Sequence, residues 1–309
     1  MGSLGRSGVL AVSIVGFCLG LLLGAIPVVG EMLASRGVST DLDCDGKYEL
    51  IVGGVVANGR GLIRVGQIHN RSVRLVSELP VEVEVRDVAT GDIDGDGMPE
   101  ILTIGAGHLR AYRIEMGEPV ALTGRRLRTA WTDRLSSLTV SDGVWIASTD
   151  YRVERDQDVG ETKITGWVAA DGQIEQMWSI DIDAHVGDLV LVSKGDDVFL
   201  VLESGTGDEG GDIRVYNVTG HPRQVWTHRL TDGVRCRALE VTEGNRVAIQ
   251  PYGGPGSLWQ VKGAGDLRRE RSLQLSPLGS IVPRVGPDGR PGTLGITAEP
   301  MWAVRTISF

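Results

Sequence analysis

The sequence predicts an all-β fold, and three observations lead to this prediction. Glycine is frequent, with 44 residues in a chain of 309, which indicates many turns. Beyond residue 37 the apolar residues occur in short runs of about strand length. Long stretches with helical periodicity are hard to find in the same part of the chain. The length suits one large domain or two small ones.

The first 37 residues differ from the rest. Residues 1–8 carry one cation, Arg6, and residues 9–29 form an uncharged apolar span. This span reaches the length of roughly 20 residues that a helix needs to cross a bilayer, whereas the apolar core of a signal peptide is usually shorter. We therefore expect a transmembrane anchor. A cleaved signal peptide and a buried soluble helix are the alternatives.

The charges that flank this span predict its orientation. Arg6 precedes it and Glu31 is the first charge after it, which favours an N-terminus in the cytoplasm. Residues 1–8 would then be cytoplasmic, 9–29 would be the anchor or signal-peptide core, and 30–37 would be a linker. Residues 38–309 would form a β-domain outside the cytoplasm, held at the membrane or secreted after cleavage.

Charge and cysteine content exclude several classes of protein. The net charge is −9, so we expect no nucleic-acid partner. A lipidated cysteine needs a small residue before it, but Phe17 precedes Cys18, so we expect no lipidation there. Cys44 and Cys236 lie far apart in the sequence, and three cysteines do not suggest a fold built on disulfides.

A fixed order of strands recurs along the chain. Residues 48–55 and 100–107 are both strand-like, and each is followed by two further strands. The stretches 172–179 and 220–227, one repeat apart, share Gly, Gln and Trp at matching positions. The Asp-Gly-x-Pro of 96–99 recurs at 288–291, four steps of the same length further along. The chain therefore contains an internal repeat.

A period of about 48 residues with four short strands per unit is typical of a β-propeller blade. Residues 38–309 accommodate about six four-stranded blades, with seven as the alternative. The last unit lacks an obvious fourth strand, so either residues near 31–38 supply it or the ring closes imperfectly. A parallel β-helix is a competing interpretation, but it would need shorter and more uniform rungs.

Two acidic loops, "TDLDCDGKYELIVGG" (40–54) and "GDIDGDGMPEILTIG" (91–105), have the same spacing of carboxylates. Aspartate or glutamate occupies positions 1, 3, 5 and 9 of each, as Asp41, Asp43, Asp45 and Glu49, and as Asp92, Asp94, Asp96 and Glu100. Glycine at position 6 permits a sharp turn, and Lys47 or Met98 at position 7 can add a main-chain carbonyl. Calcium takes six to eight such oxygens, so we predict two Ca²⁺ sites.

Other interpretations of the two loops fit less well. An EF-hand needs a glutamate at position 12 and a following helix, but Val52 and Thr103 stand there and strands follow. Magnesium prefers a smaller octahedral shell. A solvated aspartate-rich turn does not explain why two loops match at every acidic position.

The pattern D-x-D-x-D-G-x-x-[DE] before an apolar strand resembles the FG-GAP and VCBS repeats of integrin α-subunit propellers and many exported microbial proteins. The resemblance is specific at 41–54 and 92–105, partial at 284–296 and architectural elsewhere. It implies that each loop joins the first two strands of a blade and binds calcium through the ten residues named above. Asp142, Asp197 and Asp288 are isolated, so we expect no ion there. The Phe-Gly and Gly-Ala-Pro signatures are absent, and an integrin-like ligand is not implied.

Motifs of catalysis are not found in the sequence: there is no G-x-S-x-G, H-E-x-x-H, cysteine pair or phosphate loop. We expect a membrane-tethered or exported calcium-binding propeller that acts as a non-catalytic binding, adhesion or scaffolding module for a protein or glycan. Its longest loops, 148–163 and 203–212, would meet the partner, and its tryptophans would pack between blades. The alternative is a propeller enzyme, quinoprotein-dehydrogenase-like or a lyase, with its site in the central channel.

Overall fold

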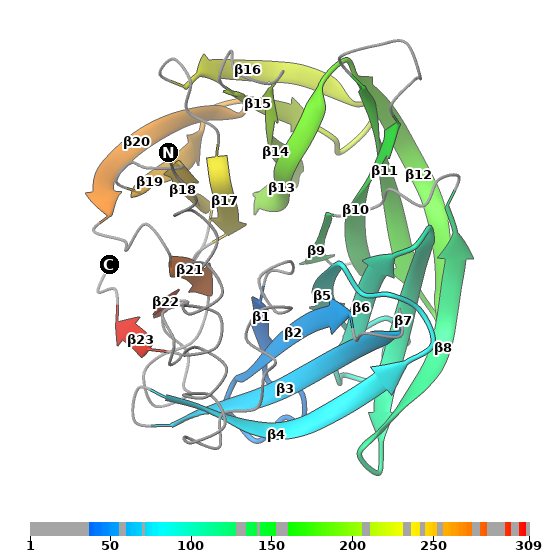
Figure 1. Ribbon diagram of the computed structural model, residues 1–309. Helices are drawn as coiled ribbons and strands as arrows, with labels where there is room; N and C mark the ends of the chain where they lie inside the picture. Colours follow the sequence, from blue (N-terminus) through cyan, green and yellow to red (C-terminus); the bar gives the residue numbers. More distant parts are fainter. Residues whose placement is uncertain are drawn as a thin grey trace, which may run out of the picture.

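The computed structural model describes residues 37–55, 60–69, 72–127, 134–140, 143–152, 160–205, 211–230, 236–241, 245–251, 256–273, 279–282, 294–297 and 303–306. These residues form 23 strands in six antiparallel sheets and contain no helix (Figure 1). The all-β prediction is confirmed. Within this part of the chain, no helix could cross a membrane, and the N-terminal segments 1–8, 9–29 and 30–36 lie outside it.

Five sheets have four strands each. The first two are β1 (Gly37–Thr40), β2 (Glu49–Val55), β3 (Gly61–His69) and β4 (Ser72–Val81), followed by β5 (Asp87–Gly91), β6 (Glu100–Gly105), β7 (His108–Glu115) and β8 (Glu118–Arg126). The third and fourth are β9 (Leu135–Val140), β10 (Gly143–Arg152), β11 (Glu161–Ala170) and β12 (Gln173–Ile182), followed by β13 (His185–Lys194), β14 (Asp197–Gly205), β15 (Gly211–Asn217) and β16 (Arg223–Arg229). The fifth is β17 (Cys236–Val241), β18 (Arg246–Pro251), β19 (Gly256–Lys262) and β20 (Asp266–Leu273). The sixth has three strands among the described residues: β21 (Gly279–Val282), β22 (Leu294–Thr297) and β23 (Ala303–Thr306).

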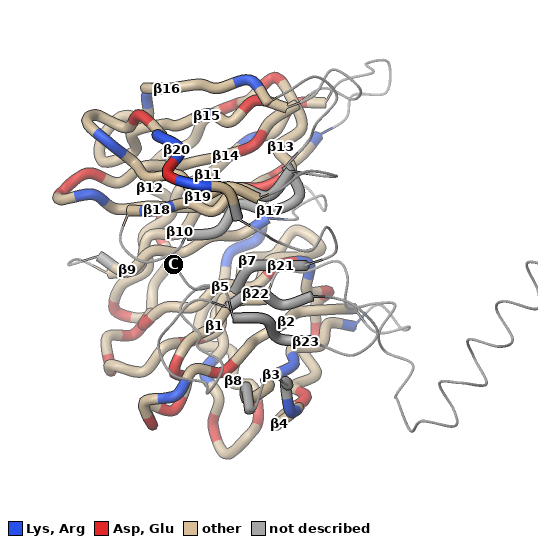
Figure 2. Tube along the Cα trace, turned by 90° about the vertical axis from the view of Figure 1, so that its left-hand side faces the viewer, with Lys and Arg blue, Asp and Glu red and all other residues tan. Residues whose placement is uncertain are grey.

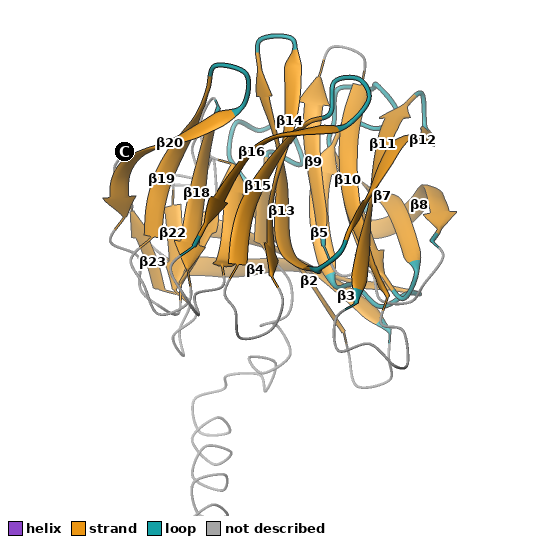
Figure 3. Cartoon of the chain, turned by 90° about the horizontal axis from the view of Figure 1, so that it is seen from above, coloured by secondary structure: helices purple, strands orange, loops and turns teal. Residues whose placement is uncertain are grey.

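Each sheet resembles a blade, because its strands are hydrogen-bonded in chain order from the first to the last. In Figure 1 the sheets stand around a common centre with the first strand of each innermost. Each first strand lies beside the first strand of the next sheet, and β21 also lies beside β1. Figure 3 shows the sheets standing side by side, with turns gathered at their two ends. The sheets therefore follow one another in space in the same order as in the chain.

Apolar side chains fill the space between successive sheets. One hydrophobic cluster joins Ile51 and Leu79 of the first sheet to Ile101 of the second, and another joins Leu109 of the second to Ile146 of the third. Two further clusters lie between the third and fourth sheets and between the fourth and fifth. Burial of this kind contributes about 25 cal/mol per Å² of apolar surface. The sheets are therefore held mainly through their faces.

Hydrogen bonds also join the innermost strands of neighbouring sheets and fix their alignment. Asp87 is fully buried, and its Oδ2 atom accepts a bond of 2.9 Å from the amide of Leu135 in the third sheet. The Ser137 hydroxyl donates to the Thr90 carbonyl at 2.7 Å, and the Leu191 amide donates to the Ser136 hydroxyl at 3.0 Å. Strands β5, β9 and β13 are thereby joined in series.

The repeated Gln-x-Trp sequence coincides with a β-bulge. Trp167 pairs with Gln176 and Gly166 with Trp178, which leaves Met177 without a partner in the register. The fourth sheet has the same irregularity between Gln224 and Trp226. One residue in the last strand of each four-stranded sheet is skipped in this way, namely Val76, Leu122, Met177, Val225 and Glu270. Bulges strengthen the local twist, so all five four-stranded sheets share a bend in the last strand, and in the third and fourth sheets it coincides with Gln-x-Trp.

The prediction that tryptophans pack between sheets is confirmed where side chains are described. Trp145 and Trp178 belong to the cluster between the third and fourth sheets, and Trp167 belongs to the cluster between the second and third. Trp226 and Trp259 are partly buried against the cluster between the fourth and fifth sheets. Figure 2 shows that charged residues of both signs are interspersed on the turns and outer strands.

The structure corrects three expectations about the strands. Gly37 and Val38 do not complete the last sheet but pair with Val52 and Ile51 in the first, because Val38 packs against the core between the first two sheets. The loop expected at 148–163 is shorter, since β10 and β11 stay paired as far as Arg152 and Glu161. The loop expected at 203–212 also begins later, because β14 runs to Gly205 and pairs with Gly211. Residues 153–159 and 206–210 lie outside the described part.

Gly166 gives a test of the packing between sheets. A Cβ atom at this position would collide with the indole of Trp178, which is held in the cluster between the third and fourth sheets. We expect Gly166→Ala to destabilise the fold by about 1–3 kcal/mol, the usual cost of overpacking, and to lower Tm by several degrees in a calorimetric scan. Gly54→Ala is the matched control, because it lies in β2 with open space around its Cα. An equal Tm for both variants would contradict the packing described.

Candidate metal centre

The two acidic loops occupy equivalent places in the first two sheets. Residues 41–48 connect β1 to β2, and residues 92–99 connect β5 to β6, so each loop joins the first two strands of its sheet. The loops adjoin one another, because the Cys44 Sγ atom lies 3.7 Å from the Gly97 carbonyl oxygen. Cys44 is a free thiol and is exposed. The two candidate sites therefore lie at the same end of neighbouring sheets.

Each loop gathers three aspartates. Carboxylate oxygens of Asp41, Asp43 and Asp45 lie within 4.8 Å of one another, and so do those of Asp92, Asp94 and Asp96. The second residue of each loop points the other way: Ile93 is fully buried in the cluster between the second and third sheets, and Leu42 packs against the cluster between the first and second. This alternation gathers the acidic side chains on one side of the loop.

Main-chain amides hold the aspartates in position. Asp41 and Asp92, at position 1, accept bonds of 2.8 and 2.9 Å from the amides of Gly46 and Gly97. The aspartates at position 5 accept a bond of 2.8 Å from the amide two residues ahead, which belongs to Lys47 or Met98.

The backbone of each loop is left-handed at two places. Gly46 and Gly97 at position 6 have φ of 85° and 89°, a conformation that glycine adopts without strain. Position 4 is also left-handed, with φ of 57° at Cys44 and 78° at Gly95. The two loops therefore share one backbone course as well as one spacing of acids.

The glutamates at position 9 connect each loop to the strand that follows. Glu49 and Glu100 are the first residues of β2 and β6, and they are only 4% and 1% exposed. Their Oε2 atoms accept bonds of 3.0 and 2.7 Å from the amides of Leu42 and Ile93. Their Oε1 atoms are buried and have no hydrogen-bond partner. A buried carboxylate oxygen without a partner is costly, and a cation would satisfy it.

Burial perturbs both glutamates in the same direction. Desolvation raises the pKa of Glu49 and Glu100 above 4.5, and the neighbouring aspartates raise it further. The amide bonds from Leu42 and Ile93, together with the Gln67 side chain near Glu49, act in the opposite direction. Without an ion, each glutamate therefore resists ionisation.

The donor set fits a hard cation. Every candidate side-chain ligand is a carboxylate oxygen, and calcium–oxygen distances of about 2.3–2.6 Å place oxygens on opposite sides of one ion about 5 Å apart. The oxygens of each aspartate group lie within 4.8 Å of one another, so they fit inside this span. Magnesium takes the same type of ligand but needs a tighter octahedron. The carbonyl oxygens of Lys47 and Met98 remain predicted ligands. The hydrogen bonds of these two residues within the loops are made by their amides.

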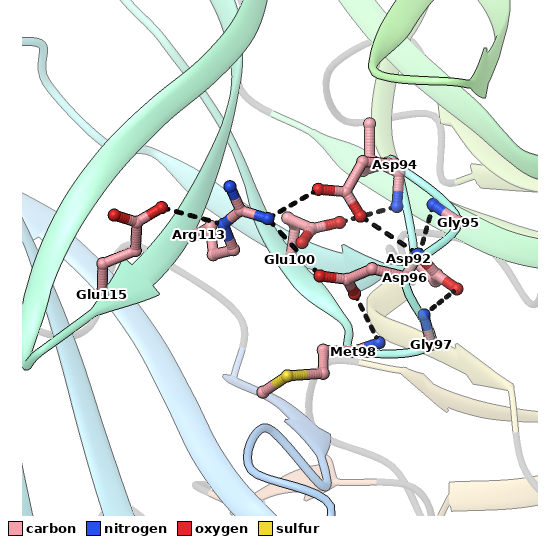
Figure 4. Close-up of polar contacts among 10 residues, drawn as sticks. Asp92, Asp94, Gly95, Asp96, Gly97, Met98, Glu100, Arg113 and Glu115 are labelled. Atoms are coloured by element: carbon pink, nitrogen blue, oxygen red, sulfur yellow. Dashed lines mark hydrogen bonds and ion pairs between the residues drawn. The ribbon is translucent and has the colours of Figure 1, made fainter.

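Basic side chains lie beside the carboxylates at both sites. The Lys47 ammonium lies 2.7 Å from Asp45 Oδ2 and is exposed. At the second site, Arg113 of β7 contacts Asp94 Oδ2 at 2.9 Å, Asp96 Oδ2 at 3.4 Å and Glu115 Oε1 at 3.1 Å (Figure 4). Sequence reasoning missed Arg113, because only the pairing of β6 with β7 brings it to the loop.

The isolated aspartates are placed differently. Asp197 accepts bonds from Asn217 Nδ2 at 3.0 Å and from the Thr219 hydroxyl at 3.4 Å, so it supports the turn after β15. Asp142 and Asp288 lie outside the described residues. Within the described part of the chain, the two loops are the places where three acids, histidines or cysteines come close enough to share an ion.

A basic hollow of about 290 Å³ lies on the second sheet, and sequence reasoning missed it also. His108 and Arg110 of β7 line it with Thr123, Gly124, Arg125 and Arg126 of β8. Desolvation lowers the pKa of His108, and the charges of Arg110 and Arg126 lower it further. Arg110 also lies 3.3 Å from Glu82, and the Arg125 Nε atom donates to the Ile174 carbonyl at 2.6 Å. The hollow is a concentration of positive charge on an acidic protein.

No protein-family model matches this chain, and no curated protein matches it in sequence. The assignment of the site therefore rests on the geometry of the two loops.

The buried glutamates give a prediction about pH. Because the pKa of Glu100 is raised in the ion-free fold, the stability it contributes there is present below pH 4.5 and is lost as the pH rises through the raised pKa. Calcium needs the ionised carboxylate. The calcium-induced rise in Tm should therefore be smaller at about pH 5 than at about pH 7.5, measured by thermal unfolding in calcium and in chelator.

Glu100→Gln separates these two effects at one position. The amide removes the unpaired charge but keeps an oxygen for the Ile93 amide, so in chelator at neutral pH its Tm should equal or exceed that of the wild type. In calcium it should lose part of the stabilisation. Glu118→Gln is the control, since Glu118 is exposed at the start of β8. A lower Tm for Glu100→Gln in chelator, with an unchanged gain from calcium, would contradict the assignment.

Proposed function

We propose that the six sheets form a closed six-bladed β-propeller of the FG-GAP/VCBS type whose first two blades each bind a calcium ion. The adjacency of successive first strands, including β21 with β1, supports a ring. Asp41, Asp43, Asp45, Glu49 and the Lys47 carbonyl hold one ion. Asp92, Asp94, Asp96, Glu100 and the Met98 carbonyl hold the other. The ions stabilise the connections between the first two strands.

One observation carries this proposal. The loops 41–49 and 92–100 each bury a glutamate with one oxygen satisfied by an amide of its own loop and the other oxygen left without a partner. An aspartate-rich turn adapted to water would keep its glutamate exposed. The same orphaned oxygen beside three aspartates, found twice, is the arrangement that a divalent ion completes.

A binding role fits the innermost strands better than catalysis does. Asp87 and Asp188, both buried there, are occupied: Asp87 accepts the Leu135 amide, and Asp188 accepts the Leu189 amide at 2.9 Å and lies 4.0 Å from Arg134 Nε. Acids engaged in this way hold the strands together. A propeller enzyme with its site in the central channel is the alternative function, and it would need acids or bases free to meet a substrate.

The partner is a protein or glycan, and the hollow on the second sheet supports an anionic contact. Arg110, Arg125, Arg126 and His108 surround the hollow on a chain of net charge −9. A carboxylate, sulfate or phosphate group is the chemistry that such side chains bind. The module would thus meet an acidic glycan or an acidic protein segment there.

The calcium sites also suit a location outside the cytoplasm, where calcium is abundant and modules with affinities of about 10⁻⁴–10⁻³ M are filled. Residues 9–29 would hold the propeller at the membrane.

Calcium binding tests the proposal directly. The purified chain should contain two calcium ions by elemental analysis, and its Tm should be several degrees higher in calcium than in chelator. Each ion contributes about 2.7 kcal/mol when free calcium exceeds Kd a hundredfold. Asp94→Asn should remove one ion and leave the other, while Asp181→Asn, exposed on β12, should keep both. Equal Tm values in calcium and in chelator would rule the sites out.

The membrane proposal has a separate test. Full-length protein should stay with membranes through an alkaline carbonate wash, because the uncharged span 9–29 partitions into the bilayer. A variant in which two leucines of 9–29 are replaced by arginine should be released by the wash. Recovery of a secreted chain that begins near Glu31 would show signal cleavage instead.

A further inference from the structure

The two calcium loops differ in the residue that faces them from the third strand of the sheet. In the first sheet Gln67 of β3 pairs with Glu49. In the second, Ile101 pairs with Tyr112, and the next residue of β7 is Arg113, whose guanidinium contacts Asp94 and Asp96 of the loop. The two loops thus share their acids, but the third strand presents a neutral amide at the first loop and a guanidinium that contacts two aspartates at the second.

Arg113 uses the atoms that an ion would need. Its NH1 atom lies 2.9 Å from Asp94 Oδ2 and 3.4 Å from Asp96 Oδ2, so one guanidinium nitrogen contacts two of the three aspartates. Figure 4 shows the guanidinium facing the loop, with Glu100 beside the same aspartates. Desolvation lowers the pKa of Arg113, but pairing with Glu115, Asp94 and Asp96 outweighs it and leaves this pKa raised.

Among the residues that the structure describes, the first site has no equivalent group. Lys47 contacts the Oδ2 atom of Asp45 alone, from a side chain that is 56% exposed. An exposed ion pair of this kind is weak and is readily exchanged for water. Gln67 carries no charge to repel a divalent ion.

We infer that Arg113 is an intramolecular competitor of calcium at the second site, so that the two sites have unequal affinities. The loop at 41–49 binds first, and the loop at 92–100 binds at higher calcium. When the second ion enters, the guanidinium gives up Asp94 and Asp96 and keeps Glu115, which it already contacts at 3.1 Å. This inference rests on the proposed calcium sites and adds an order of filling to them.

The charges explain why arginine and ion exclude each other. Two like charges a few ångströms apart repel, and the carboxylate lone pairs that accept from Arg113 cannot also coordinate calcium. In the ion-free state the same arginine offsets part of the negative charge of the four crowded acids. Arg113 therefore lowers the calcium affinity of the second loop and stabilises this loop when calcium is absent. A two-step response to calcium concentration follows from this exchange.

Calorimetric titration of the full chain with calcium tests the inference. The wild type should show two affinities, and the single-site variants Asp43→Asn and Asp94→Asn assign each one to a loop. Arg113→Gln, which copies Gln67, should tighten the second site by about three- to tenfold. Gln67→Arg should weaken the first site by a similar factor. Arg64→Gln is the matched control, because Arg64 also lies on a third strand and its ion pair with Glu78 is at the surface.

Thermal unfolding separates competition from a merely structural role. Arg113→Gln should lower Tm in chelator, because Asp94 and Asp96 lose their counter-charge, yet it should increase the gain in Tm on adding calcium. A structural role alone would lower Tm in both conditions and leave the gain unchanged, which would overturn the inference. Two equal affinities that Arg113→Gln does not alter would overturn it too, while the proposed calcium sites would stand. An absence of calcium binding in the wild type would remove both proposals.

Discussion

The structure depends on one constraint: no sheet can bury its apolar faces alone. The second, third and fourth sheets bury apolar side chains on both faces, and hydrophobic clusters lie between successive sheets from the first to the fifth. The chain satisfies this constraint by placing each new sheet against the previous one. The hydrogen bonds from Asp87, Ser136 and Ser137 then fix how the innermost strands align.

The acidic loops are a local departure from this apolar scheme. Glu49 and Glu100 begin strands in the core, and each brings a carboxylate into surroundings where a charge is costly. The Leu42 and Ile93 amides satisfy half of each carboxylate, and the aspartates add repulsion to the rest. A positive charge nearby stabilises such a loop, and Arg113 supplies part of it at one of them. If the loops bind calcium as proposed, stability and ion binding are coupled through the same few oxygens.

Much of this could be predicted from local sequence. Turn residues and short apolar runs predicted strands, and the spacing of Asp and Gly predicted both loops with their acids on one side. The Gln-x-Trp sequence was recognised as a repeat, but not as a bulge. Only the strand pairing shows that Gln176 and Trp178 flank an unpaired residue in the last strand of the sheet. The innermost strands β1 and β5 were overlooked, because both are short and neither shows the alternation that marks a half-exposed strand.

The sequence by itself determined the all-β class, the number of units, and the acids of the candidate sites, because each of these depends on residues close together in the chain. Only the tertiary structure decided how the sites differ. Arg113 reaches Asp94 from 19 residues away through the pairing of two strands, and the basic hollow is assembled from β7 and β8 in the same way. Tertiary contacts also decided that Gly37 and Val38 join the first sheet, since a short strand at this point of the sequence could have completed either the first or the last sheet. Register and burial are set by contacts between distant residues, and a pattern in one segment does not contain them.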